Sequence, residues 1–116
     1  MDGEISGPEL QEALDSDDKP LIVDIRNGRQ FERLRIPGSV NIPLAELPQR
    51  IETLRDADHV VTVCPHGQAS VKAARLITSF EGFSGTVESL SCGITGWEGA
   101  TEGEDMGTEE SADAPF

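Results

Sequence analysis

Cys64 stands where a thiol can act as a nucleophile. It ends the apolar run HVVTVC at residues 59–64, and a short loop then leads into the helical pattern SVKAARLITSF. In open α/β sheets, ligands bind at the carboxyl ends of strands, and a loop that opens a helix presents N–H groups to negative charge. This setting lowers the pKa of a thiol and favours the thiolate, which is the form that attacks sulfur. We expect an anionic persulfide sulfur to be held by the loop residues Pro65, His66, Gly67, Gln68, Ala69 and Ser70.

Several residues of this loop have more than one interpretation. Gly67 supplies backbone freedom for a tight turn, and Ser70 is placed to cap the helix that follows. His66 either hydrogen-bonds a substrate or is solvated. For Cys64 the alternative is a small apolar residue at a strand end, because free cysteines are often buried and inert.

The elements that would position Cys64 alternate between strands and helices. Apolar runs predict strands at about 21–25, 39–43, 59–64 and 86–90, and helical spacing predicts helices over about 8–15, 28–34, 43–54 and 70–80. Pro48 lies early in the third of these helices or breaks it. The alternation predicts an α/β fold with a mostly parallel sheet. We place a single domain in residues 1–98 and an acidic, disordered tail in residues 99–116, which lack an apolar period.

Charge and cysteine content exclude several classes of protein. The formal net charge is −13, lysine occurs only at Lys19 and Lys72, and such a surface repels phosphate and anionic lipid. We therefore expect no nucleic-acid and no membrane partner. Abundant acids with few lysines are typical of a high-salt cytoplasm, and an ordinary acidic protein with an acidic tail is the alternative. Two cysteines and no signal peptide indicate a cytoplasmic protein, and the cysteines and histidines are spaced unsuitably for zinc.

Over residues 4–98 the chain resembles the rhodanese family. The matching blocks are LIVDIR (21–26), FERLRIPGSVNIP (31–43), VVTVCPHGQAS (60–70), AARLI (73–77) and LSCGITGW (90–97). The resemblance implies a single rhodanese-like domain whose sheet of about five strands has helices on both faces. It also implies that Cys64 carries sulfane sulfur as a persulfide without a metal or organic cofactor, and that Asp24 and Arg26 form a supporting polar pair. Arg29 is either a cationic helper near the site or an exposed helix residue.

The sequence departs from the family pattern at two positions. Ala69 stands where the family often has arginine, so binding of a dianion such as thiosulfate should be weak without that bidentate donor. Cys92 stands where the family usually has the first of two glycines. Cys92 is either a second thiol that resolves the persulfide or pairs with Cys64, which needs a Cα separation below about 7 Å, or a buried small residue.

The resemblance implies a sulfurtransferase of the thiosulfate sulfurtransferase (rhodanese) type. It would take sulfur from a small donor or a protein persulfide and pass it to a thiol, cyanide or a protein acceptor, and we expect a monomer. The alternative is a non-catalytic or redox-regulatory binding module of the same fold. A phosphatase is disfavoured, because the loop from Cys64 to Ala69 has six residues where the related dual-specificity phosphatases have one more, and because the loop arginine is absent.

Overall fold

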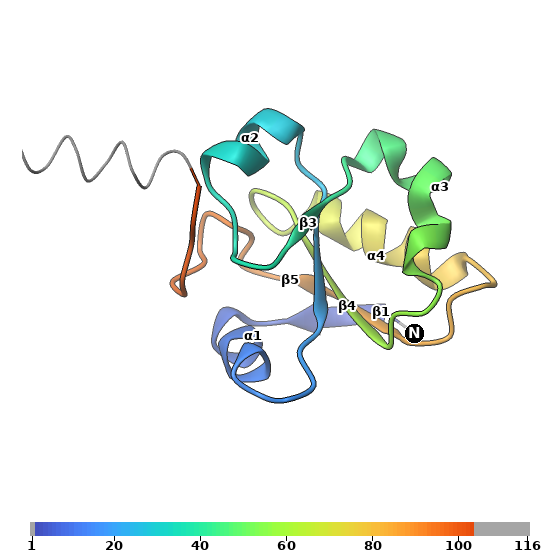
Figure 1. Ribbon diagram of the computed structural model, residues 1–116, viewed down its shortest axis with the longest axis horizontal. Helices are drawn as coiled ribbons and strands as arrows, with labels where there is room; N and C mark the ends of the chain where they lie inside the picture. Colours follow the sequence, from blue (N-terminus) through green and yellow to red (C-terminus); the bar gives the residue numbers. More distant parts are fainter. Residues whose placement is uncertain (1, 104–116) are drawn as a thin grey trace, which may run out of the picture.

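The computed structural model describes residues 2–103, which form a five-stranded sheet with helices on both of its faces (Figure 1). The elements in chain order are β1 (Asp2–Ile5), α1 (Gly7–Leu14), β2 (Leu21–Asp24), α2 (Gly28–Arg33), β3 (Val40–Asn41), the 3₁₀ helix η1 (Leu44–Glu46), α3 (Leu47–Arg50), the 3₁₀ helix η2 (Ile51–Leu54), β4 (His59–Val63), α4 (Ala69–Ser79) and β5 (Thr86–Leu90). This confirms the predicted α/β class.

The sheet has the strand order β1-β5-β4-β2-β3, and every neighbouring pair is parallel. The long apolar strand β4 lies at the centre, between β5 and β2. Val63 is paired with Asp24 of β2, and Thr62 is paired with Ser89 of β5. The carboxyl ends of the three central strands therefore meet at one edge of the sheet, where Cys64 follows β4.

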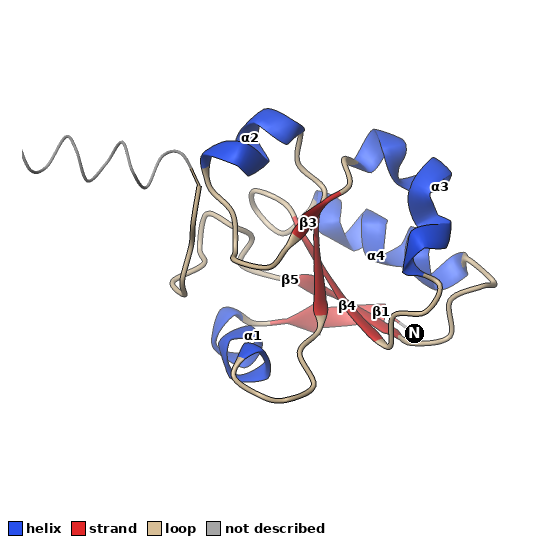
Figure 2. Ribbon diagram, in the orientation of Figure 1, coloured by secondary structure: helices blue, strands red, loops and turns tan. Residues whose placement is uncertain are grey.

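Two apolar cores fill the two faces of the sheet. Alternate residues of β4 point to opposite faces, so that Val61 packs with Leu10 of α1 whereas Val60 packs with Leu47 of α3 and Ile77 of α4. Figure 2 shows α1 on one side of the strands and α3 and α4 on the other. Because β4 is covered on both faces, its sequence is a nearly continuous apolar run.

Two elements differ from the sequence-based expectation. Strand β1 was not predicted, because Ile5 is its only strongly apolar residue, and it forms by pairing along β5 from Asp2↔Val87 to Ile5↔Leu90. The helix predicted over 43–54 is divided into η1, α3 and η2, with Pro48 at the start of α3. Proline lacks the N–H that a continuous helix would need at that point.

Part of the predicted tail is among the described residues. Glu102 forms an antiparallel bridge with Arg35, and the Trp97 Nε1–H donates to the carbonyl of Ala100 at 2.9 Å. Residues 104–116 lie outside the described residues, so the disordered tail stays a prediction. In residues 2–103, none of the helices has the length and apolar character needed to span a membrane.

Candidate active site

The thiol of Cys64 is buried at the carboxyl end of β4. Cys64 is 2% exposed and belongs to the core on the α4 side of the sheet. The backbone N–H of Gly67 donates to Cys64 Sγ at 3.0 Å, and Sγ lies 3.3 Å from Ser70 Oγ. The loop after β4 thus curls back on the sulfur atom, as predicted from the spacing.

These contacts shift the pKa of the Cys64 thiol. Burial raises it, whereas the Ser70 hydroxyl and the backbone N–H groups of Ser70, His66 and Gly67 lower it, and the combined hydrogen bonds exceed the effect of burial. The pKa of Cys64 is therefore below the usual thiol value. A larger fraction of this cysteine is thiolate near neutral pH than in an ordinary thiol.

Two glycines allow the loop to approach the segment that follows β5. Gly67 has φ +83°, and a Cβ there would lie 2.2 Å from the carbonyl oxygen of Ser91. Gly93 has φ +67°, and its Cβ would lie 2.3 Å from the carbonyl oxygen of Pro65. The Ile94 N–H also donates to the Cys64 carbonyl at 2.9 Å. The residues after β5 therefore hold the loop backbone in place from one side.

Ser70 does not cap α4, so that part of the sequence prediction is wrong. The cap position is Gln68, which makes no side-chain capping bond, and Ser70 is inside the first turn and fully buried. Its hydroxyl points to the interior and lies 2.6 Å from the hydroxyl of Ser89 on β5. Thr62 Oγ1 donates to the Ser70 carbonyl at 2.8 Å, which fixes the start of α4 on β4.

The other side chains of the loop face outward. His66, Gln68 and Ala69 are exposed, and Pro65 is half-buried. The loop from Pro65 to Ala69 contains no lysine or arginine, so its attraction for anions comes from backbone N–H groups. Ala69, the first residue of α4, is exposed.

Asp24 and Arg26 form the predicted polar pair. Both are buried, and Arg26 Nε and Nη2 donate to the Asp24 carboxylate at 2.9 and 2.7 Å. Arg26 Nη2 also donates to the carbonyl of Leu34 just after α2, and Asn41 Nδ2 donates to the carbonyls of Asp24 and Arg26. The pair therefore ties the end of β2 to α2 and β3, beside the strand that carries Cys64.

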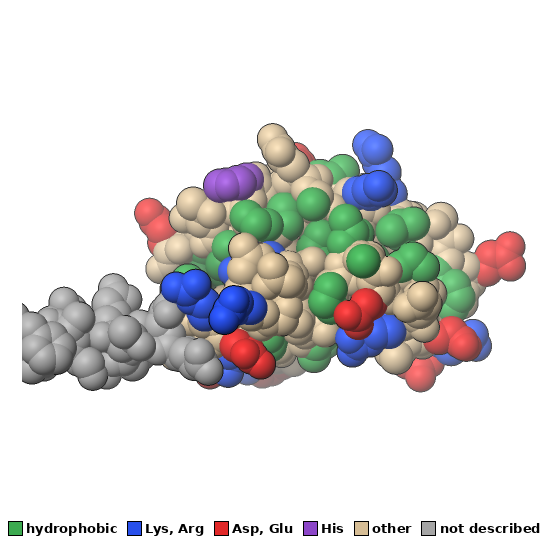
Figure 3. Space-filling model, turned by 90° about the horizontal axis from the view of Figure 1, so that it is seen from above, with side chains coloured by type: hydrophobic (Ala, Val, Ile, Leu, Met, Phe, Trp, Pro, Cys, Tyr) green, Lys and Arg blue, Asp and Glu red, His purple; other side chains and the backbone are tan. Residues whose placement is uncertain are grey.

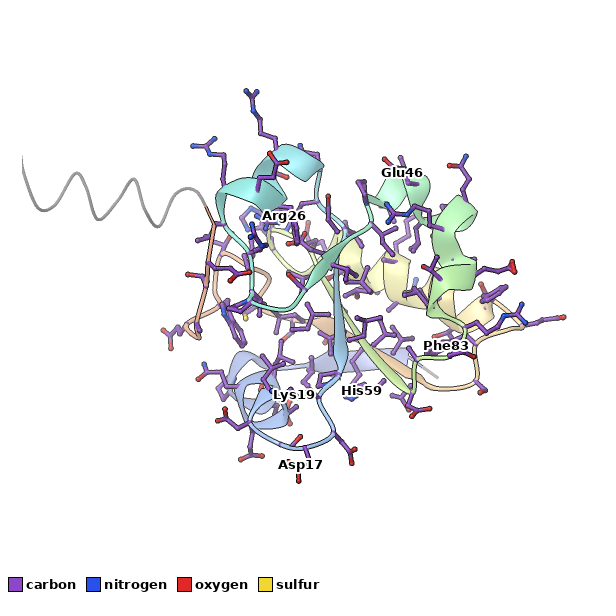
Figure 4. The ribbon with its side chains drawn as sticks, in the orientation of Figure 1. Asp17, Lys19, Arg26, Glu46, His59 and Phe83 are labelled. Atoms are coloured by element: carbon purple, nitrogen blue, oxygen red, sulfur yellow. The ribbon has the colours of Figure 1, made fainter. Side chains whose placement is uncertain are left out.

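Figure 4 places Arg26 at the upper edge of the sheet and His59 with Lys19 at the opposite edge. His59 begins β4, and its Nε2 lies 2.6 Å from Glu88 Oε1 on β5. Arg29 is exposed in the first turn of α2. The structure thus gives His59 a cross-strand partner far from Cys64, and it leaves Arg29 at the surface.

Cys92 and Cys64 pack in different cores, on opposite faces of the sheet. Both cysteines are free, and Cys92 packs against the core on the α1 side of the sheet, whereas Cys64 belongs to the core on the α4 side. Cys92 Sγ lies 3.4 Å from the position that a Cβ on Gly7 would occupy. Cys92 occupies a half-buried packing position at the start of α1.

Positive charge is concentrated in the middle of the sequence. Residues 25–75 hold eight of the nine Lys and Arg residues and five acids, a net charge of +3, although the whole chain carries −13. Figure 3 looks down on the upper edge and shows apolar side chains in the middle, with Lys and Arg side chains around the margin, some beside acids. The acidic excess lies in other parts of the chain.

Sequence analysis did not identify Ser89, Thr62 or Gly93 as parts of the site. The sequence did indicate that Ser89 is buried, because successive side chains of a strand point to opposite faces and Ser89 shares its face with the buried Val87. A serine on a buried strand face needs a hydrogen-bond partner. Which partner it finds depends on the pairing of β5 with β4, which the linear pattern does not show.

Comparison with known proteins identifies the family of this chain. The family model for the rhodanese-like domain matches residues 6–100. The chain is 34% identical over 99 residues to YrkF of Bacillus subtilis (strain 168), which is provisionally named a sulfur carrier protein, with 85% of this chain and 52% of YrkF covered. The chain thus spans about half the length of YrkF.

The chain is also similar to a relative of comparable length and to a solved structure. The thiosulfate sulfurtransferase GlpE of Pseudoalteromonas translucida (strain TAC 125) is 32% identical over 96 residues, with 83% of this chain and 89% of GlpE covered. The solution structure of a rhodanese-like domain from Anabaena sp. superposes with a TM-score of 0.79 at 22% identity, covering 91% of this chain and 83% of that domain. The chain belongs to the rhodanese-like domain family.

Proposed function

We propose that this domain is a sulfurtransferase that carries sulfane sulfur as a persulfide on Cys64. The observation that supports this most strongly is the pair of polar contacts at the sulfur: the Gly67 N–H donates to it at 3.0 Å, and the Ser70 hydroxyl is its hydrogen-bond partner at 3.3 Å. Hydrogen bonds of this kind stabilise an anionic sulfur in a buried place. An inert core cysteine has no need of them.

The proposed reaction has two displacement steps. The Cys64 thiolate attacks the sulfane sulfur of a donor, the new S–S bond forms, and the donor leaves with the electron pair of its broken bond. A nucleophile such as cyanide or a thiolate then attacks the terminal sulfur, and Cys64 leaves as a thiolate. No net oxidation occurs, because the sulfur atom moves between two nucleophiles.

The donor that fits this loop best is a persulfide of a protein or of a small thiol. A dianion such as thiosulfate would lack a bidentate charged donor at the exposed Ala69. The positive residues on the surrounding helices offer it a diffuse attraction only. We therefore expect a high KM for thiosulfate and a lower one for a persulfide donor.

Steady-state formation of thiocyanate from cyanide tests the proposal, with glutathione persulfide and thiosulfate as alternative donors. Cys64→Ser should lose activity by about 10³-fold or more, because the nucleophile is absent, while Cys92→Ser should stay within about twofold of the wild type. Equal activity of the wild type and Cys64→Ser with both donors would contradict the proposal.

An arginine at the loop position tests the donor preference. Ala69→Arg should lower the KM for thiosulfate by about tenfold or more, since a bidentate charged hydrogen bond contributes about 1.5–3 kcal/mol. Gln68→Arg is the matched control, because Gln68 is also exposed but stands one residue away from the family position. An equal gain in both variants would show that net charge alone governs donor binding.

The second candidate is a binding module of the same fold. It is favoured by the burial of Cys64, which is 2% exposed and packed in the core on the α4 side. Such a module would transfer no sulfur to cyanide from either donor. The thiocyanate assay therefore distinguishes the two candidates.

A further inference from the structure

A short chain of buried hydroxyl groups lies directly behind Cys64. Cys64 Sγ is 3.3 Å from Ser70 Oγ, and Ser70 Oγ is 2.6 Å from Ser89 Oγ. Ser70 and Ser89 are both 0% exposed, and they come from the first turn of α4 and from the middle strand pair of the sheet, β5 beside β4. The sulfur atom is thus the end of a three-atom hydrogen-bonded chain whose two hydroxyl groups are buried from solvent.

Ser89 has no evident packing reason to be polar. Its neighbour on the same strand face, Val87, lies in the apolar core with Ala73, Ala74 and Cys64. A buried hydroxyl costs free energy unless it is hydrogen-bonded. Within residues 2–103, the Ser89 hydroxyl has one partner, which is Ser70 Oγ. What Ser89 provides is therefore a contact to Ser70, and through Ser70 to the sulfur.

The number of protons shared by Cys64, Ser70 and Ser89 in this hydrogen-bonded chain favours the thiolate form of Cys64. Two contacts, S···O and O···O, can hold one proton each. When Cys64 is a thiol, the chain contains three protons, so one of them has no acceptor within the chain. When Cys64 is a thiolate, two protons remain, and Ser89 can donate to Ser70 while Ser70 donates to the sulfur. The thiolate form is the one in which every hydrogen-bonding group of the chain is satisfied.

We propose that Ser89 is a positioning residue, which directs the Ser70 hydroxyl toward Cys64 and so stabilises the thiolate both before sulfur is accepted and when sulfur is passed on. Ser89 touches neither substrate nor sulfur. In the persulfide, the charge is on the terminal sulfur and not on Sγ, so Ser89 assists the two displacement steps rather than the storage of the persulfide. This inference rests on the proposed sulfur transfer for its role in turnover, but not for its effect on the free thiol.

The rate of Cys64 alkylation by iodoacetamide as a function of pH tests the proposal on the full chain. Peptide mass mapping separates modification of Cys64 from that of Cys92. In Ser89→Ala, the thiolate fraction of Cys64 near neutral pH should fall about three- to tenfold, so the pH profile shifts upward. Ser91→Ala is the matched control, because it removes an exposed hydroxyl two residues further along, which bonds the Ile5 carbonyl.

Thermal unfolding of each variant shows that the fold is intact, and Ser89→Thr restores a hydroxyl at the same position. An unchanged alkylation profile in folded Ser89→Ala, or an equal shift in Ser91→Ala, would overturn the proposal. A profile shifted in Ser89→Ala and restored toward wild type in Ser89→Thr would support it. Failure of sulfur transfer by the wild type would refute the proposed function, but it would leave this effect on the thiol measurable.

Discussion

The two ends of the sheet treat polar groups differently. At the carboxyl end, Asp24 and Arg26 are buried with side chains 1% and 6% exposed, and the Cys64 sulfur takes part in two hydrogen bonds inside the core. At the amino end, the polar pair is His59 with Glu88, whose side chains remain 32% and 28% exposed. Buried, hydrogen-bonded polar groups occur at the end of the sheet where the loop positions the sulfur. Partly solvated polar groups occur at the opposite end, which has no such loop.

The buried pair should show the largest difference between the two ends. Asp24→Asn leaves the Arg26 guanidinium buried without its counter-charge, so we expect the free energy of unfolding to fall by about 3–5 kcal/mol. Glu88→Gln at the amino end removes a partly exposed partner and should cost less than about 1 kcal/mol. Urea unfolding of both variants measures the difference. Equal losses would show that the ends do not differ in this way.

A smaller difference is expected between two glycines with left-handed backbone. Gly67→Ala adds a Cβ 2.2 Å from the Ser91 carbonyl oxygen at φ +83°, and should destabilise the fold by about 2–4 kcal/mol as well as displacing the loop. Gly38, in the turn before β3, has φ +85° but no atom within 4 Å of such a Cβ. Gly38→Ala should therefore cost only about 1–2 kcal/mol. Similar losses of unfolding free energy in the two variants would mean that the loop backbone shifts readily to accommodate the added Cβ.

The pH dependence of stability should give the smallest of the three effects. The pKa of Cys64 is lower in the folded than in the unfolded chain, where it is about 8.5. The thiolate therefore contributes stability that is fully present above pH 8.5 and is lost as the pH falls through the folded value. Relative to Cys64→Ser, the wild type should gain stability as the pH rises through this window.

Cys92→Ser provides the control for that measurement. Its free energy of unfolding should change with pH in the same way as that of the wild type, because Cys64 is intact. If Cys64→Ser retained the full pH dependence of the wild type, the hydrogen bonds to the sulfur would not favour the thiolate in solution.

Much of the site could be predicted because it lies in one continuous segment. The apolar run of β4, the six-residue loop and the helix after it are local, and their order alone places Cys64 at the carboxyl edge. Contributions from distant segments could not be predicted. Ser89 reaches Ser70 only through the pairing of β5 with β4, and Gly93 meets Pro65 only because the chain turns back after β5.

Two local details were also beyond the sequence pattern. Serine is a common helix-capping residue, but α4 begins at Ala69, so Ser70 is already inside the helix. Its hydroxyl faces the core and not the helix end. Strand β1 has the sequence Asp-Gly-Glu-Ile, which lacks the alternation of a strand, and it depends on the free edge of β5 for its formation. Both cases show tertiary contacts overriding local preference.

The intact mass of the protein after incubation with glutathione persulfide tests the central claim most directly. We predict a gain of about 32 Da, the mass of one sulfur atom, which a reductant removes, which Cys92→Ser retains and which Cys64→Ser abolishes. No gain in the wild type, or a gain that persists in Cys64→Ser, would contradict the assignment of the persulfide to Cys64.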